Sequence, residues 1–200
     1  SRGTFVAAHA HGAEGIRRAV RAGVRSIEHG SYLDDEGIAL MRRHGTYLVA
    51  DVYNGDYIDE IGRRDGWPEE ILRKNQETTD IQRQAFRRAV RAGVNIAFGT
   101  DSGVYPHGEN ARQFAYMVRY GMTPMQAIQS ATINAARLLG RETEIGSLQP
   151  GRRADLLLTK STCCCSRNAS CKAILSKLST SAATRSTSQR SLSRGSLIVC

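Results

Sequence analysis

Two histidines and one aspartate stand where short apolar segments of this chain end. His9 closes the segment 4–9, His29 closes the segment 24–29, and Asp101 follows the segment 95–99. Imidazole and carboxylate groups are the ligands that bind zinc and similar divalent ions, and catalytic sites use three of them beside an open position. The residue types therefore predict a metal site with His9, His29 and Asp101 as ligands.

Asp101 is suited to two roles. A carboxylate next to an activated water can bind the ion with one oxygen and accept the proton of the water with the other. We therefore predict that Asp101 is also the general base. The alternative is a helix N-cap, because Thr100, Asp101 and Ser102 have good capping chemistry, but the next helix is expected to begin only near Glu109.

Three further residues are candidates for binding the substrate: His11, His107 and Tyr53. His11 lies two residues after His9, so in an extended strand both side chains point to the same side. His11 can therefore chelate the same ion or line the pocket. His107 lies in the segment 105–110 after the third ligand, and Tyr53 follows another apolar run. The alternatives for these two are holding the turn and packing.

The elements that must position these residues repeat along the chain. The octapeptide 17–24 recurs unchanged at 87–94, and each copy combines a helical apolar stripe with a glycine that lets the helix end. The expected strands are 4–9, 24–29, 46–52 and 94–100, and the expected helices are 13–22, 35–43, 69–92, 109–120 and 124–139. A loop is expected between 52 and 69. This alternation predicts an α/β fold with four parallel βα units, which is half of a (β/α)8 barrel.

Composition changes abruptly near residue 160. The net charge is +9, but residues 1–160 contribute only +3, and the last forty residues hold six basic residues and no acidic one. We expect residues 1–140 to form the half barrel and residues 141–160 to form a turn and a strand outside it. Residues 161–200 are rich in serine and cysteine and are expected to be disordered, since they offer little apolar surface to bury. A shifted reading frame would explain this tail.

The same composition limits partners and location. All five cysteines follow residue 160, so the cysteine-free main body is compatible with a reducing compartment, and we expect a cytoplasmic protein. No apolar run approaches the roughly 18 residues that span a bilayer, and the scattered arginines do not form a nucleic-acid stripe. We therefore expect neither a membrane nor a nucleic-acid partner. The start at Ser1, inside a strand-like run, predicts that this chain is part of a larger protein.

Several phrases of the chain together resemble the amidohydrolase superfamily, and most closely its imidazolonepropionase-like branch, which includes Xaa-Pro dipeptidases. They are Val6-Ala7-Ala8-His9-Ala10-His11-Gly12, Ile27-Glu28-His29-Gly30, Gly99-Thr100-Asp101-Ser102-Gly103 and Pro106-His107-Gly108, followed by a matching helix at 127–136 and a strand near 151–156. The resemblance covers residues 1–160 and implies the C-terminal half of the barrel. It also implies that residues 141–160 return toward a small β-sandwich.

The resemblance implies a metal-dependent hydrolase of amide or other C–N bonds, with one or two divalent ions, usually zinc. By position, His9, His29 and Asp101 match the ligands of the fifth, sixth and eighth barrel strands. The implied substrate is a small molecule or dipeptide, and a homo-oligomer is compatible with it. The family also needs ligands that would precede Ser1, so we predict that this chain alone is inactive. The alternatives are a truncated product without catalytic function and a polyanion binder that acts through its basic tail.

Overall fold

A parallel β-sheet lies at the centre of the protein. The computed structural model describes residues 4–153, 156–159 and 196–199. The four strands of the sheet follow one another in chain order: β1 (Ala7–Ala10), β2 (Ser26–His29), β3 (Tyr47–Val49) and β4 (Asn95–Ile96). Every pairing is parallel, so the carboxyl ends of all four strands lie along one edge. The predicted α/β fold with a parallel sheet is confirmed.

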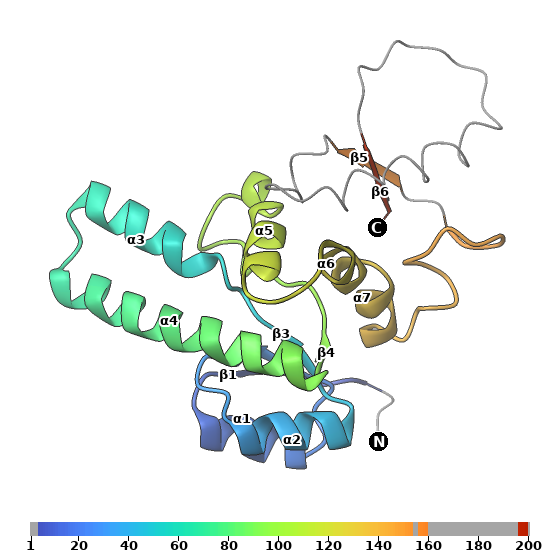
Figure 1. The fold of residues 1–200 in the computed structure, drawn as a ribbon, viewed down its shortest axis with the longest axis horizontal. Helices are drawn as coiled ribbons and strands as arrows, with labels where there is room; N and C mark the ends of the chain where they lie inside the picture. Colours follow the sequence, from blue (N-terminus) through green and yellow to red (C-terminus); the bar gives the residue numbers. More distant parts are fainter. Residues whose placement is uncertain (1–3, 154–155, 160–195, 200) are drawn as a thin grey trace, which may run out of the picture.

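Helices connect and cover the strands (Figure 1). They are α1 (Ala13–Arg21), α2 (Asp35–His44), α3 (Asn54–Asp65), α4 (Glu69–Ala92), α5 (Arg112–Arg119), α6 (Pro124–Ala131) and α7 (Ile133–Leu138), with a 3-10 turn η1 at His107–Glu109. Helix α4 has the predicted bounds. Helices α1 and α2 lie side by side, whereas α3 and α4 form a long hairpin that extends away from the sheet.

The repeated octapeptide forms the same local structure twice. Its helix ends at a glycine with a positive φ, 85° at Gly23 and 74° at Gly93. The next residue then donates its backbone N–H to a carbonyl of the helix, from Val24 to Ala19 at 3.3 Å and from Val94 to Ala89 at 3.0 Å. Glycine reaches this conformation without the steric cost of a Cβ. Each copy therefore turns a helix directly into the following strand, β2 or β4.

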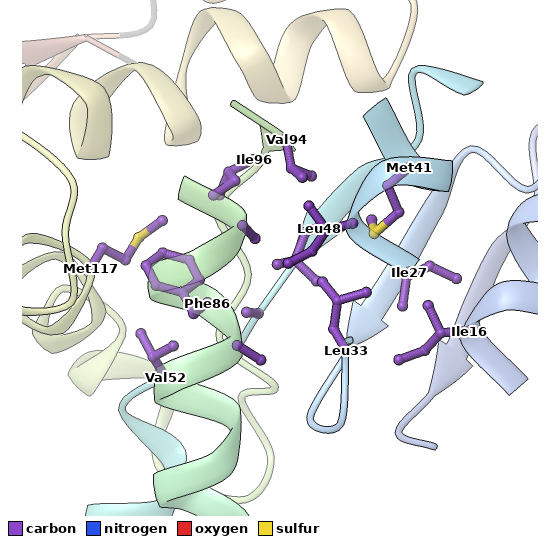
Figure 2. Close-up of a cluster of buried hydrophobic side chains, with 14 of the residues drawn as sticks. Ile16, Ile27, Leu33, Met41, Leu48, Val52, Phe86, Val94, Ile96 and Met117 are labelled. Carbon is purple, nitrogen blue, oxygen red and sulfur yellow. The ribbon is translucent and has the colours of Figure 1, made fainter. Parts of the chain in front are cut away.

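One hydrophobic core joins the sheet to the helices (Figure 2). Ile16 of α1 and Met41 of α2 pack over Ile27 and Leu48 of the sheet, and all four side chains are buried. Phe86 continues the core toward the opposite side, near the buried Val52 and Met117. Burying each such side chain contributes about 1.5–3 kcal/mol, so these contacts fix the strands whose ends carry the histidines.

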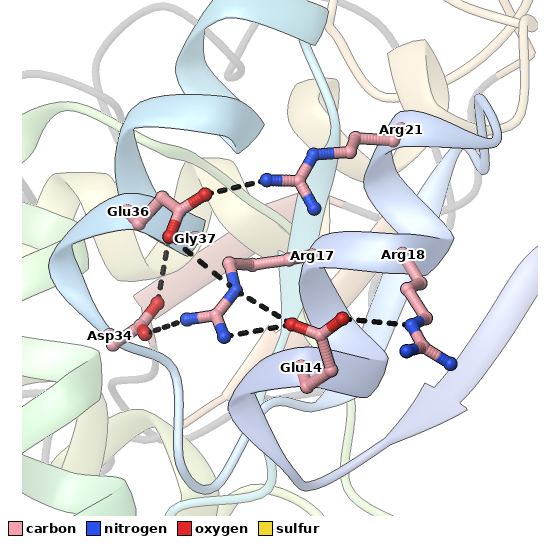
Figure 3. Close-up of polar contacts among 7 residues, drawn as sticks. All are labelled: Glu14, Arg17, Arg18, Arg21, Asp34, Glu36 and Gly37. Carbon is pink, nitrogen blue, oxygen red and sulfur yellow. Dashed lines mark hydrogen bonds and ion pairs between the residues drawn. The ribbon is translucent and has the colours of Figure 1, made fainter.

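The outer face of α1 and α2 is held by ion pairs (Figure 3). The pairs are Arg17–Glu14 at 2.9 Å, Arg18–Glu14 at 2.8 Å, Arg21–Glu36 at 2.6 Å and a close contact between Arg17 and Asp34. Exposed pairs of this kind contribute only about 0–1 kcal/mol each. These pairs place the carboxylates of Glu14, Asp34 and Glu36 beside the three arginines of the first octapeptide copy.

Helix α3 differs from the expected loop between 52 and 69. Its glycines lower helix propensity, but they also let α3 approach α4 closely. A Cβ on Gly55 would lie 1.9 Å from Oγ1 of Thr79, and a Cβ on Gly62 would lie 2.5 Å from Cδ2 of Leu72. Contact with α4 therefore stabilises a helix that its own sequence does not favour.

Other boundaries differ from the predictions in smaller ways. The helix expected at 124–139 is broken at Thr132, whose backbone (φ −119°, ψ −98°) is not helical, so that α6 and α7 are separate. The helix expected at 109–120 begins at Arg112, after η1, and the strands are shorter than predicted. Thr123 caps α6, and its side chain and that of Gln126 form a reciprocal capping box.

Two short strands lie outside the main sheet. Strand β5 (Leu156–Thr159) falls in the segment where a return strand is predicted, and it pairs antiparallel with β6 (Ser196–Val199). The rest of the predicted disordered tail and all five cysteines lie outside the described residues, so the domain boundaries remain predictions. Among the described helices, none combines the length and the apolar character needed to cross a bilayer.

Candidate metal centre

An unusual backbone conformation brings His29 to His9. In the register of β1 and β2, His9 lies opposite Glu28 and His29 lies opposite Ala10. In regular strands the side chain of His29 would then lie on the other face of the sheet from that of His9. His29 instead has a φ of +68°, and its ring centroid lies 4.5 Å from that of His9. The left-handed turn at the strand end therefore places both imidazoles in one site.

His11 completes a cluster of three imidazoles. Its ring centroid lies 4.8 Å from that of His9 and 4.7 Å from that of His29, and the rings of His11 and His29 are stacked at 18°. Nδ1 of His11 also lies 2.8 Å from the hydroxyl of Ser31, which fixes one side of the ring. Each of the three histidines offers a ligand nitrogen within 4.8 Å of the others.

Asp101 reaches the same site from the segment after β4. Its φ is +52°, and in the described part of the chain it shares a positive φ only with His29 among residues other than glycine. Such conformations cost about 1–3 kcal/mol and concentrate at functional sites. A carboxylate oxygen of Asp101 lies within 4.8 Å of ligand atoms of His29 and Asp51. Thus His9, His29 and Asp101, predicted from three distant segments, line one cavity at the end of the sheet, and His29 belongs to both groups of ligand atoms.

Asp51 is a member of this site that the sequence analysis missed. It follows β3 by two residues and is buried, with 8% of its surface exposed. Its Oδ1 lies 3.2 Å from Nδ1 of His29 and accepts a hydrogen bond from Nε2 of Gln82 at 2.8 Å. Its position just after an apolar run is the same signal that identified Asp101.

Asn54 links the two carboxylates. Its Nδ2 donates to Oδ2 of Asp51 at 3.0 Å and to Oδ2 of Asp101 at 3.3 Å. The carbonyl Oδ1 of Asn54 is buried and has no hydrogen-bond partner. Asn54 and Gln82 were also missed, because Asn54 lies in the segment expected to be a loop and Gln82 has the local sequence of an ordinary polar helix residue. Asn54 begins α3, and Gln82 lies 31 residues after Asp51.

Charges in the site shift the pKa values of its titratable groups. Burial raises the pKa of Asp51, but hydrogen bonds with His29, Asn54 and Gln82 and the nearby imidazole outweigh it, so the pKa falls to about 2. The hydrogen bond with Asp51 in turn raises the pKa of His29. Burial, followed by the charges of the other two histidines, lowers the pKa of His11. The site therefore holds an ionised carboxylate directly against one proposed ligand.

The two remaining predicted residues, Tyr53 and His107, lie apart from this cluster. Tyr53 is only 2% exposed, and its ring centroid lies 5.1 Å from those of Tyr105 and Tyr116. Its hydroxyl accepts a hydrogen bond from Arg112 at 3.0 Å. His107 is exposed in η1. Neither side chain lines the cavity at the histidines, so the structure does not bring them together with His9 and His29.

Two adjoining cavities open at the cluster. Both are lined by His9, His29, Asp51 and Asp101. The first, of about 220 Å³, lies over the strand ends and reaches Thr100. The second, of about 480 Å³, continues along α3 and α4. Their combined size matches the range of small-molecule sites.

The donor set fits a divalent ion. Imidazole nitrogens and carboxylate oxygens suit zinc and related metals, and the structure offers two overlapping groups that share His29: His9 with His11, and Asp51 with Asp101. A histidine ligand whose second nitrogen bonds a carboxylate, as His29 does, is the usual supporting arrangement in metal sites. The buried, unpartnered carbonyl of Asn54 is a further polar group beside this site.

Comparison with known proteins identifies the family. Residues 1–187 match the amidohydrolase family. Among curated proteins, the ochratoxinase of Aspergillus niger is 38% identical over 155 residues, covering 76% of this chain and 32% of the relative. The imidazolonepropionase of Geobacillus kaustophilus is 39% identical over 77 residues, covering 36% of this chain and 18% of the relative.

Solved structures agree with this result. A Xaa-Pro dipeptidase with methionine bound in its active site is 45% identical, with a TM-score of 0.72 over 78% of this chain and 38% of the other. The crystal structure of the A. niger ochratoxinase is 38% identical, with a TM-score of 0.65 over 77% of this chain and 35% of the other. The chain thus spans about a third of the length of these relatives. It belongs to the amidohydrolase family.

Proposed function

We propose that this chain provides metal ligands and the general base of a hydrolase that cleaves amide or related C–N bonds in small molecules or dipeptides. The observation that carries the proposal is that His9, His29 and Asp101 line one cavity at the carboxyl edge of the sheet, where His29 lies within ligand distance of both groups of donors. Family membership and the similarity to a Xaa-Pro dipeptidase and an ochratoxinase support an amide-bond substrate.

His9, His29 and Asp101 would hold the ion, for which zinc is the best candidate. A zinc ion supplies a Lewis acid that polarises a carbonyl and lowers the pKa of water to about 7. The residues of the chain supply the proton transfer. Asn54 binds Oδ2 of Asp101, which leaves Oδ1 to accept a proton from the attacking water and to return it to the leaving nitrogen. Proton transfer of this kind contributes about 10²–10⁴-fold to the rate.

Asp51 has a supporting role in this proposal. Its contact with Nδ1 of His29 at 3.2 Å would leave Nε2 of that imidazole for the metal. Asn54 donates to Asp51 and to Asp101, so it sets the spacing of the two carboxylates. In this proposal Asp51 therefore orients the ligand His29, and Asp101 accepts and returns the proton.

His11 is the best candidate for contact with the substrate. It lines the larger cavity, and Ser31 fixes its orientation. We retain Tyr53 and His107 as weaker candidates, since neither lines the cavity in the described part of the chain. The buried ring of Tyr53 packs against Tyr105 and Tyr116, which favours a packing role at the start of α3 over contact with the substrate.

Zinc binding by the purified chain tests the metal site. We expect one zinc ion per chain in equilibrium dialysis, and a loss of at least about tenfold in affinity for His9→Ala and Asp101→Asn. His44→Ala is the matched control, because His44 is exposed at the end of α2, away from the cavity. Equal affinities for all four proteins would refute the site and favour a product without catalytic function.

Hydrolysis is best tested in a hybrid enzyme. Residues 4–153 would replace the matching segment of the Xaa-Pro dipeptidase that is 45% identical. We expect the hybrid to cleave dipeptides, and Asp101→Asn in the hybrid to lower kcat by about 10²-fold or more. A hybrid that binds zinc but retains full kcat after Asp101→Asn would rule out Asp101 as the general base.

A further inference from the structure

The larger cavity is a groove that follows one face of α4. The residues of α4 that line it are Ile71, Lys74, Asn75, Thr78, Thr79 and Gln82. Their spacing places them on a single stripe of the helix. Gln82 contacts Asp51 at 2.8 Å, whereas Ile71 lies eleven residues earlier. At 1.5 Å per residue, the stripe from Gln82 to Ile71 is about 16 Å long, and its Gln82 end lies beside Asp51.

The chemistry of the groove changes along this stripe. Near the cluster its walls are mostly polar, with Gln82 and Thr79 on α4 and Asn54 on α3, and Val104 beside Asp101 is the apolar exception. Toward the tip of the hairpin they include the apolar Ile71 and Trp67, and Ile58 adds an apolar residue from the first turns of α3. These are lining residues of the same cavity, not a separate patch.

The apolar end is unusually open to solvent. Trp67 is 41% exposed and Ile71 is 48% exposed, although both line a cavity. The one charged residue in this part, Lys74, already pairs with Glu70 at 2.7 Å. The groove end is therefore suited to an uncharged apolar group and has little to attract a carboxylate.

We propose that the groove binds an extended short peptide of about four or five residues, with its scissile amide at the histidines and an apolar side chain at Trp67 and Ile71. An extended chain spans about 3.3–3.6 Å per residue, so a length of about 16 Å matches this number of residues. In the polar middle, Nδ2 of Asn75 donates to the carbonyl of Gly55 at 2.8 Å and the hydroxyl of Thr78 lies 3.3 Å from that of Tyr32. The carbonyl Oδ1 of Asn75 and the remaining capacity of the Thr78 hydroxyl can hydrogen-bond a peptide backbone, which a plain acyl chain does not require. This inference rests on the proposed function, and it extends the substrate class beyond dipeptides.

Trp67 is the single tryptophan of the chain, so its fluorescence reports directly on the apolar end of the groove. The probes are Gly-Gly-Gly-Leu, Leu-Gly-Gly-Gly, tetraglycine and Gly-Leu, titrated without metal. We expect at least one leucine tetrapeptide to shift the Trp67 emission and to bind about tenfold more tightly than tetraglycine and Gly-Leu, because a leucine side chain becomes partly buried. No shift of Trp67, or equal affinities for all four peptides, would overturn the proposal.

Two isoleucines of the same helix provide matched variants. Ile71 lines the groove, whereas Ile81 is 39% exposed on α4 and lies outside the lining. Ile71→Asn should remove the tenfold preference for the leucine peptide, and Ile81→Asn should keep it, with circular dichroism showing that both variants fold. A preference that survives Ile71→Asn, or that Ile81→Asn abolishes equally, contradicts the assignment. Zinc binding by His9 and Asp101 is measured separately, so failure of the groove and failure of the metal site are distinguishable.

Discussion

Replacing Asp51 by asparagine tests whether this buried carboxylate supports the metal site through His29. The change keeps the size of the side chain but removes the charge. Loss of a carboxylate behind a histidine ligand lowers metal affinity by about 10–100-fold. The contact between Asp51 and Nδ1 of His29 is 3.2 Å, at the long end of the hydrogen-bond range. We therefore expect the lower limit, about tenfold, which equals about 1.4 kcal/mol.

The expected effect depends on pH in a defined direction. Asp51 raises the pKa of His29, so Asp51→Asn should lower it. A proton competes with the metal for the imidazole, and this competition weakens in the variant. The tenfold loss of zinc affinity should therefore be largest above the pKa of His29 and should shrink as the pH falls through it.

The assay is competition for zinc with a chromophoric chelator across this pH range, together with an NMR titration of the metal-free histidines. Asp56→Asn is the matched control. Asp56 is also a carboxylate of the α3 region, but it pairs with Arg83 at 2.6 Å and does not line the cavity at the histidines. Equal losses for Asp51→Asn and Asp56→Asn, or an unchanged pKa of His29 in the Asp51 variant, would refute the reasoning.

Three further predictions concern stability. Gly55→Ala should lower the free energy of unfolding by about 1–3 kcal/mol because its Cβ would overlap Thr79. Gly15→Ala on α1, where a Cβ would have nothing within 4 Å, should instead raise the free energy of unfolding by about 0.5–1 kcal/mol. Urea denaturation that gives the opposite order for the two variants contradicts the account of the α3–α4 contact. Asp34→Ala should cost about 1 kcal/mol because the N-cap bond to Gly37 at 2.8 Å is lost; an unchanged melting temperature speaks against it. Zinc at 100 times its dissociation constant should stabilise the chain by about 2.7 kcal/mol, and a chelator should reverse this in differential scanning calorimetry.

The regular elements could be predicted because their signals are local. The octapeptide 17–24 and its copy contain the apolar stripe, the terminating glycine and the start of the next strand within a few residues. Both copies form the same structure, and α4 has its predicted bounds. Helix α3 could not be predicted in this way, since Gly55 and Gly62 argue against a helix until α4 is packed against them.

The ligand types were also a local signal. His9, His29 and Asp101 each follow an apolar run, and parallel strands deliver their carboxyl ends to one edge. Asp51 carries the same signal and was overlooked. Gln82 has no such signal, because its role comes from a contact with a residue 31 positions away.

Thus the sequence by itself determined the α/β alternation, the family and the residue types of the proposed metal site. Only the tertiary structure decided how these side chains face one another. In an ordinary strand His29 would point away from His9, and its φ of +68° reverses this direction. The packing of α3 on α4 then brings Asn54 and Gln82 to the carboxylates and opens the groove toward Trp67. These relations depend on contacts between distant segments, which no local pattern of residues records.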